Sequence, residues 1–104
     1  MFRVTTPTHT FIMPVDTSDC AEILLTYKQG DLSMSKHYEN GIVPDGMTLD
    51  ENQVIQTLTQ EETKRFKVGF ANVQIRVLLN NGKSYASQIF KVGINEVLNG
   101  AILS

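Results

Sequence analysis

The stretch from Leu58 to Val92 constrains the fold of this chain more than any other segment. Within it, Asn72–Leu79 alternates apolar and polar residues with a period of two, which is typical of a strand with one buried face. The Asn81-Gly82 pair that follows is the strongest short signal for a β-hairpin, because a type I′ turn needs positive φ at both central residues. The segment therefore predicts a long strand, a tight turn and a return strand, as in one half of a β-sandwich.

The length of this turn decides the register of the hairpin. A two-residue turn pairs Val77 with Ala86 and Val73 with Phe90. A three-residue turn with a bulge uses Asn80 as well and shifts this register. The two-residue turn is our prediction, and the three-residue alternative stays open.

The four residues Thr59-Gln60-Glu61-Glu62 form a capping box, the signature of a helix start. The Thr59 hydroxyl accepts from the Glu62 N–H, and the Glu62 carboxylate reaches back to the Thr59 N–H. Because Gly69 follows soon after, the helix has room for only one or two turns. Phe66 then precedes the long strand.

This order of strand, corner and strand resembles the corner before the penultimate strand of immunoglobulin-like sandwiches. Phe66 takes the place of the aromatic residue there and lacks the hydroxyl that bonds the backbone. Cys20 has no cysteine partner and the chain has no Trp, so an antibody-type domain is excluded. We predict an all-β fold: a single immunoglobulin-like β-sandwich of about seven strands with a short helical corner.

The N-terminal half is less clearly patterned. Alternation across Ala21–Lys28 favours a strand, whereas the spacing of Cys20, Ile23, Leu24 and Tyr27 also satisfies a helical template. We predict the strand, and the helix stays open. Glu39–Gly46 reads as a loop, and Gln56 is polar where an inward apolar residue is expected. The remaining predicted strands are His9–Met13, Leu32–Tyr38, Met47–Leu49 and Val54–Leu58.

Length and charge limit the classes of function. A chain of 104 residues with 41% hydrophobic residues suits one domain, residues 1–104, with one core. Nine Lys and Arg against eleven Asp and Glu give a net charge of -2, so neither nucleic acid nor an anionic membrane is an expected partner. The lone Cys20 fits a reducing compartment, and MFRVTTPTHTF lacks a signal peptide's apolar stretch. We expect a protein made in the cytosol.

The isolated histidines and the cysteine offer weak candidates for chemistry. His9 and His37 have no ligand-spaced neighbour in the sequence, and zinc needs three or four convergent ligands. Cys20 has no nearby base that would activate a nucleophile, so we expect a buried, structural thiol. The sequence predicts no catalytic residue, no cofactor and no metal site, and hence no enzyme.

The charged clusters have structural explanations as well. Glu61 and Glu62 are accounted for by the capping box and the helix dipole. The basic residues Lys64, Arg65 and Lys67 are offset by these two glutamates, which predicts a solvated face. A last group of oxygen-bearing side chains consists of Asp45, Asp50, Glu51 and Asn52. Their spacing does not match that of any defined calcium-binding loop.

The C-terminal segment 94–104 is apolar beyond the last predicted strand. It either closes the sandwich, as a strand or a short helix ending at Gly100, or docks on a partner protein. We predict docking, because Asn99-Gly100 interrupts the segment where a closing strand would continue. The predicted contact residues are Ile94, Val97, Leu98, Ile102 and Leu103.

Four blocks of the chain resemble small uncharacterised proteins of tailed phages and prophages of Gram-positive bacteria. They are TTPTHTFIMPVDTS, ILLTYKQG, LTQEETKRF and VQIRVLLNNGKSYASQIFKVGINEVLNG. The genes of such proteins lie among those for virion structural proteins, and no catalytic motif belongs to the family. The resemblance implies a virion structural or assembly protein that acts through protein–protein contacts, with other phage structural proteins or further copies of itself as partners.

This resemblance leaves a second function open, namely a prophage-encoded binding or regulatory module that acts on a host protein. For both functions we expect synthesis in the host cytoplasm. For a virion structural or assembly protein we also expect a location in the virion.

Overall fold

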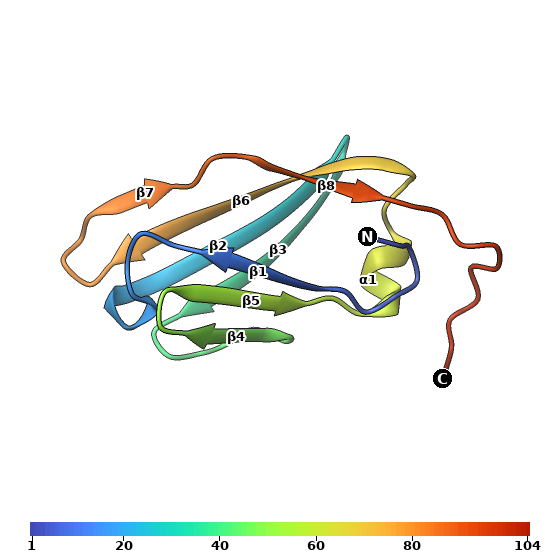
Figure 1. Cartoon of the computed structure of the whole chain (residues 1–104). Helices are drawn as coiled ribbons and strands as arrows, with labels where there is room; N and C mark the ends of the chain where they lie inside the picture. The colour runs from blue at the N-terminus through green and yellow to red at the C-terminus, as the bar shows by residue number, and fades with distance from the viewer.

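Two antiparallel sheets face each other in the computed structural model, which describes residues 1–104 (Figure 1). The first sheet has the order β1-β5-β4, made of Thr8–Ile12, Gln53–Thr57 and Met47–Asp50. The second sheet begins β3-β2-β6, made of Leu32–Glu39, Cys20–Gln29 and Gly69–Leu79. Both β7 (Ser84–Ala86) and β8 (Phe90–Ile94) pair with the free edge of β6. The predicted all-β sandwich is confirmed.

The strand order is that of an immunoglobulin-like sandwich without its first strand. In that fold, strands B, E and D share one sheet, and C and its extra neighbour C′ share the other with F and G. Here β1, β5 and β4 correspond to the first group, and β2, β3, β6 and β7–β8 to the second. The chain forms eight strands, which become the predicted seven when β7 and β8 are counted as one interrupted strand.

The ambiguous segment Ala21–Lys28 is a strand, as predicted, and lies inside β2. It pairs along one edge with β3 and along the other with β6, so its backbone groups are satisfied from both sides. Ile23, Leu25 and Tyr27 are fully buried on its inner face. The pairing along both edges therefore fixes the segment as a strand, and the period of two places these three side chains on one surface.

The other predicted strands are confirmed with boundary shifts of at most one residue. They correspond to β1, β3, β4 and β5. The loop at Glu39–Gly46 is confirmed except at its first residue, since Glu39 still belongs to β3 and bridges to Ile42. A short 3-10 helix, η1 (Thr17–Asp19), joins β1 to β2.

The structure corrects the predicted register of the hairpin between β6 and β7. Val77 pairs with Tyr85, and Ala86 pairs with Arg76, so the predicted Val77–Ala86 pair is wrong by one residue. The turn has three residues, because the Leu79 N–H donates to the Lys83 carbonyl across it, and Gly82 takes φ 87°.

The predicted Val73–Phe90 pair is nevertheless correct. The chain leaves the sheet between β7 and β8, and this break restores the register that the turn had shifted. Ser87 fills the break, since its N–H donates to the Ile75 carbonyl and its hydroxyl accepts from the Ile75 N–H.

The corner between the sheets forms as predicted. Thr59 caps the five-residue helix α1 (Gln60–Lys64), and both reciprocal hydrogen bonds of the capping box are present. Phe66 is fully buried, which confirms it as the aromatic anchor. No phenol hydroxyl is available here, and the Phe66 carbonyl instead accepts from the Arg3 guanidinium at 2.6 Å.

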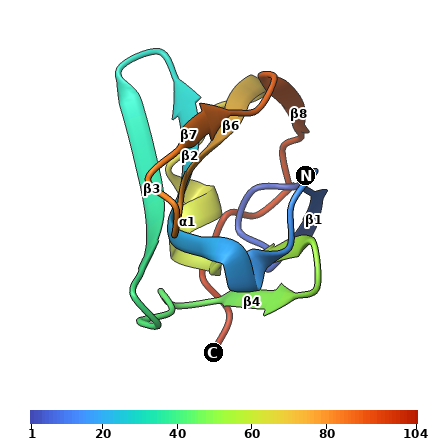
Figure 2. The ribbon, with the colours of Figure 1, turned by 90° about the vertical axis from the view of Figure 1, so that its left-hand side faces the viewer.

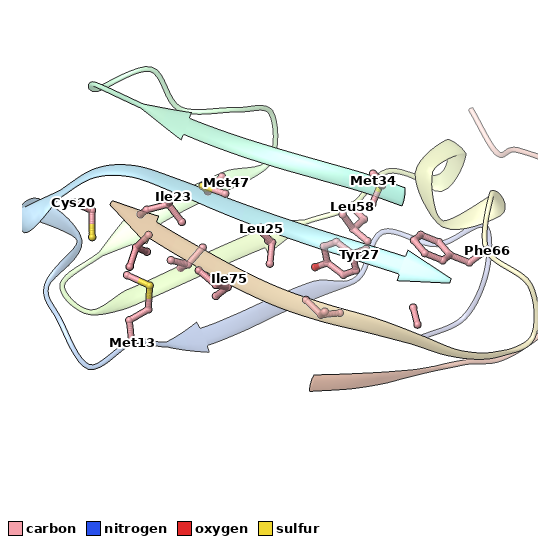
Figure 3. Packing of buried hydrophobic residues seen from close by; sticks show 14 of the residues in the cluster. Met13, Cys20, Ile23, Leu25, Tyr27, Met34, Met47, Leu58, Phe66 and Ile75 are labelled. Carbon is pink, nitrogen blue, oxygen red and sulfur yellow. The ribbon is translucent and has the colours of Figure 1, made fainter. Parts of the chain in front are cut away.

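One continuous core fills the space between the sheets (Figure 3). Tyr27 lies at its centre, with its ring 6.3 Å from that of Phe66 and its hydroxyl 2.8 Å from His9 Nδ1. Gln56 is fully buried as well, and its amide N–H donates to the carbonyls of Asp45 and Thr57. The side chain of this unexpected glutamine therefore holds the loop before β4 by a hydrogen bond to the Asp45 carbonyl. Its side-chain oxygen has no hydrogen-bond partner.

The two chain ends lie beside α1 at the same end of the elongated molecule (Figure 1). In the view turned by 90°, β3, β2, β6 and β7 form one layer, with β1 and β4 across from them (Figure 2). This arrangement brings the tail after β8 next to the N-terminal residues and the corner.

Candidate interaction surface

The tail, defined here as residues 95–104, forms no helix and no strand. It begins alongside the N-terminus, where Asn95 bridges to Phe2 and accepts from the Arg3 N–H at 2.9 Å. Near its end, the Gln60 side chain donates to the Leu103 carbonyl and accepts from the Leu103 N–H, at 2.8 and 2.9 Å. Backbone and polar contacts therefore hold the tail on the body of the protein.

The apolar side chains of the tail remain largely in solvent. Leu98 is fully exposed, Leu103 is 76% exposed and Ile102 is 40% exposed, whereas Val97 is half-buried. The prediction that Ile94 contacts a partner is wrong, because Ile94 is 2% exposed and belongs to the core cluster. It ends β8 opposite Gly69, so the pairing of β8 with β6 turns it inward. The remaining four predicted contact residues stay available to a partner.

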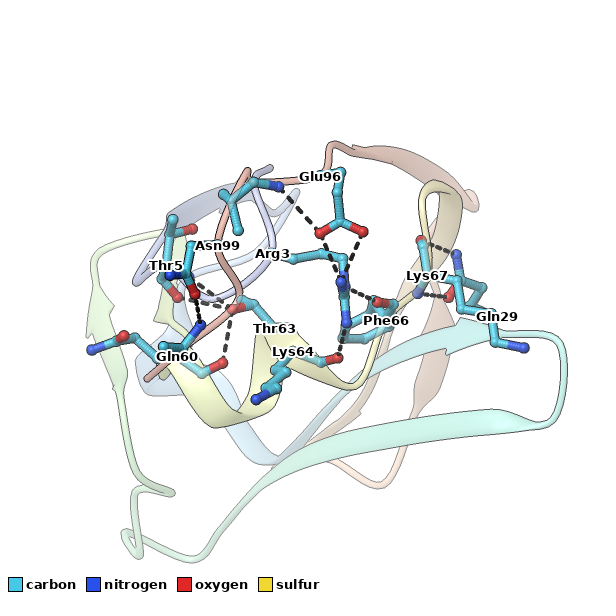
Figure 4. A network of polar contacts seen from close by, with 12 residues as sticks. Arg3, Thr5, Gln29, Gln60, Thr63, Lys64, Phe66, Lys67, Glu96 and Asn99 are labelled. Atoms are coloured by element: carbon cyan, nitrogen blue, oxygen red, sulfur yellow. Dashed lines mark hydrogen bonds and ion pairs between the residues drawn. The ribbon is translucent and has the colours of Figure 1, made fainter. Parts of the chain in front are cut away.

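Arg3 links the tail to the corner (Figure 4). Its guanidinium donates to both Glu96 carboxylate oxygens, at 2.7 and 2.9 Å, and to the carbonyls of Lys64 and Phe66. These carbonyls lie at the C-terminal end of α1 and just beyond it, where a cation is favourable. The hydrogen bond from Arg3 holds the pKa of Glu96 below its ordinary value.

One long side of the sandwich is open. β1 has β5 as its only strand neighbour, so its other edge carries unpaired backbone groups at the position of the missing first strand. Phe11 of β1 approaches Phe90 of β8 across this side, with ring centroids 5.9 Å apart. Ile12 and Ile89 are 72% and 61% exposed there. The open side therefore combines apolar side chains with strand edges.

An apolar cleft of about 240 Å³ lies between β1 and the β7–β8 segment. Phe11, Met13, Ile75, Tyr85 and Phe90 contribute to its wall. The Tyr85 hydroxyl is buried without a hydrogen-bond partner, and burial raises its pKa. The apolar lining of the cleft suits an apolar side chain.

The structure gives His9 and Cys20 different environments. His9 bonds the buried Tyr27 hydroxyl, and partial burial lowers the pKa of its imidazole. Cys20 is 4% exposed, which confirms the predicted buried thiol. Desolvation and the nearby charges of Asp19 and Asp16 raise the thiol pKa. Each side chain is thus used in packing.

The charged residues of the corner are held by structural contacts. Glu62 caps α1 and forms an ion pair with Lys36 of β3. Burial alone would raise the pKa of Glu62, but the hydrogen bonds from Lys36 and Thr59 outweigh it and lower the pKa. The Lys67 N–H donates to the Gln29 side chain at 2.7 Å. Glu61, Lys64 and Arg65 form no ion pair.

The acidic residues around β4 do not converge. Asp50 ends β4, and Glu51 occupies the next turn with φ 52° and a carbonyl that accepts from Thr17. The Asn52 amide donates to the Met13 carbonyl at 3.2 Å. Asp45, Asp50 and Glu51 belong to no group of three potential metal ligands.

The structure does bring His37 together with Glu22 and Glu39, whose ligand atoms all lie within 4.8 Å of one another. His37 has no ligand-spaced neighbour along the chain, and the strand pairing supplies the two carboxylates instead. A signal existed in the sequence, because a two-residue turn at Gly30-Asp31 places Glu22 opposite Glu39. The turn sets the register of β2 against β3. This register, rather than the spacing of residues along the chain, brings the three side chains together.

Comparisons with family models, with curated proteins and with solved structures each find no match to this chain. None of its helices has the length and apolar character that crossing a membrane requires. The sandwich fold and the surfaces described above are therefore the basis for a functional proposal.

Proposed function

We propose that this protein is a virion structural or assembly protein of a tailed phage or prophage, acting through protein–protein contacts rather than catalysis. The four sequence blocks that resemble small phage proteins support the setting. The exposed apolar tail supports the mode of action and is the observation that carries the proposal. Its expected partners are other phage structural proteins and further copies of this chain.

The tail is suited to docking because its apolar side chains gain little from the body of the protein. Leu98 and Leu103 leave most of their surface in water, while the polar groups beside them are satisfied by Glu96 and Gln60. Burial of such side chains by a partner contributes roughly 25 cal/mol per Å², offset in part by the cost of ordering both surfaces.

The open side of the sandwich offers a second contact surface. An extended segment can add to the unpaired edge of β1, since strand addition uses main-chain hydrogen bonds for affinity and side-chain pockets for specificity. The cleft beside Phe11 and Phe90 supplies one such pocket. A sandwich with an unpaired β1 edge and an exposed apolar tail has the features of a module that joins neighbours.

Deletion of Asn99–Ser104 tests the role of the tail. We expect a folded protein of nearly unchanged thermal stability, since the deleted side chains bury little, that no longer self-associates in size-exclusion chromatography with light scattering. The double change Leu98→Ser with Leu103→Ser should act in the same way. Ile42→Ser is a matched control, because Ile42 is 74% exposed on a loop outside the tail. Unchanged association of both tail variants would contradict the proposal.

Mass spectrometry of purified phage particles tests the setting. We expect this chain in the particle, or bound to capsid or tail precursors during assembly. Its absence from both, together with capture of a host protein, would favour the regulatory alternative.

A further inference from the structure

Glu22, His37 and Glu39 form a cluster on the outer face of the β2–β3 hairpin. Their side chains point away from the core, because the alternate residues Ile23 and Tyr38 occupy the opposite positions in each strand. The His37 Nε2 atom lies 2.9 Å from a Glu22 carboxylate oxygen. The three potential ligand atoms, one from each residue, all lie within 4.8 Å of one another.

The register leaves this cluster short of positive charge. Glu22 and Glu39 are direct cross-strand partners, and like charges in that position are destabilising. Neither carboxylate forms an ion pair with a Lys or Arg side chain. Arg76 is the basic residue nearest by register, since it pairs with Leu24 on the same face. The cluster therefore places two carboxylates in a small volume beside one imidazole.

We propose that Glu22, His37 and Glu39 bind a divalent first-row transition metal ion such as Zn²⁺. Zinc accepts one imidazole nitrogen and carboxylate oxygens at about 2.0–2.2 Å, so tetrahedral ligand atoms lie about 3.3–3.6 Å apart. The 2.9 Å contact between His37 Nε2 and Glu22 is a hydrogen bond that the ion would replace, and the ligand atoms, all within 4.8 Å of one another, would move closer together to surround it. An imidazole favours such ions over Mg²⁺ or Ca²⁺, which prefer oxygen ligands alone.

The surroundings support a site with an open coordination position. Glu22 and His37 contribute to the wall of a shallow hollow of about 540 Å³, together with Arg76 and Tyr85. The hollow gives water access to the ion, so that three protein ligands and one water complete a tetrahedron. The ligands also stand on a rigid support, since β2 is paired along both edges and Glu39 is fixed by two backbone hydrogen bonds with Ile42.

Isothermal titration with ZnCl₂ alone tests this proposal, using the full chain without an affinity tag. We expect one ion per chain. His37→Ala and Glu39→Gln should each weaken binding at least tenfold, since removal of even an outer-shell partner of a metal site costs about 10–100-fold. Arg76→Gln, which removes a nearby positive charge, should bind as tightly or more tightly.

Two controls locate the ion. Glu61→Gln removes an exposed carboxylate at α1, and Cys20→Ser removes the thiol. Both should leave the affinity unchanged, and loss of binding in Cys20→Ser would place the ion at the thiol and overturn the proposal. Equal binding by wild type and His37→Ala, or no binding by wild type, would overturn it as well.

NMR of the wild-type protein gives a test that needs no variant. Addition of Zn²⁺ should shift the His37 ring resonances and the backbone amides of Glu22 and Glu39, leaving the His9 ring unchanged. Shifts confined to His9 or to the chain termini would contradict the site. Because this site is separate from the tail, its outcome is independent of the proposed assembly role.

Discussion

The corner at Thr59–Phe66 and the tail after Asn95 lie at the same end of the molecule and share the Arg3 side chain (Figure 4). Both contain well-formed polar contacts. They differ in what happens to their apolar residues, because Phe66 is fully buried whereas Leu98 is fully exposed. Hydrogen bonds can therefore place a segment, but burial of an apolar side chain is what makes it part of the fold.

This difference has an energetic basis. A hydrogen bond formed in the folded state replaces one with water and contributes only about 0.5–1.5 kcal/mol. Burying an aromatic ring removes its whole surface from water and adds packing contacts. The corner should thus dominate the stability of this end of the molecule, and the tail should contribute little.

Phe66→Ala should produce the largest effect. We expect the free energy of unfolding to fall by about 3–5 kcal/mol, the usual cost of emptying an aromatic site in a core. Phe70→Ala is the control, because Phe70 is 67% exposed and should change stability little. Urea denaturation of the three proteins measures the difference, and equal midpoints for both variants would mean that the corner is no more important than an exposed strand position.

Thr59→Ala should have a smaller effect, about 1 kcal/mol, the typical loss for a helix N-cap. The change removes the hydroxyl that accepts from the Glu62 N–H and leaves the Glu62 bond to the Thr59 N–H in place. Thr59→Ser keeps the acceptor and should remain close to wild type in the same denaturation experiment. A loss as large as that of Phe66→Ala would show that capping, rather than burial, secures the corner.

Acid should release the tail with the smallest effect on overall stability. The Arg3 hydrogen bond lowers the pKa of Glu96 in the folded state, so the contribution of this pair is present above the ordinary glutamate pKa of about 4.5. It is lost as the pH falls through the lowered pKa.

The measurement is the backbone amide shifts of Val97 and Leu98 followed by NMR between pH 7 and pH 2. They should move toward random-coil values at the acidic end. In Glu96→Gln this acid transition should be absent, and its persistence would assign the release to another group.

The sequence indicated most of the fold, because its signals were local. The capping box around Thr59, the alternation in Asn72–Leu79 and the turn at Gly30-Asp31 each involve residues close together in the chain. The hairpin after Leu79 was predicted one residue out of register, since Asn80 suits either turn length. Gln56 stood out as polar, but its partner carbonyls come from a loop whose path the sequence does not give.

By itself, the sequence determined the all-β class and the buried corner at Phe66, because periodicity and capping depend on near neighbours. It favoured a strand at Ala21–Lys28 over a helix, and the pairing with β3 and β6 decided between them. Only the tertiary structure decided that Ile94 closes the core while Leu98 stays in water. These outcomes depend on strand pairing between distant segments. A shift of one residue there reverses which side chains face the core, and local pattern alone leaves that shift undetermined.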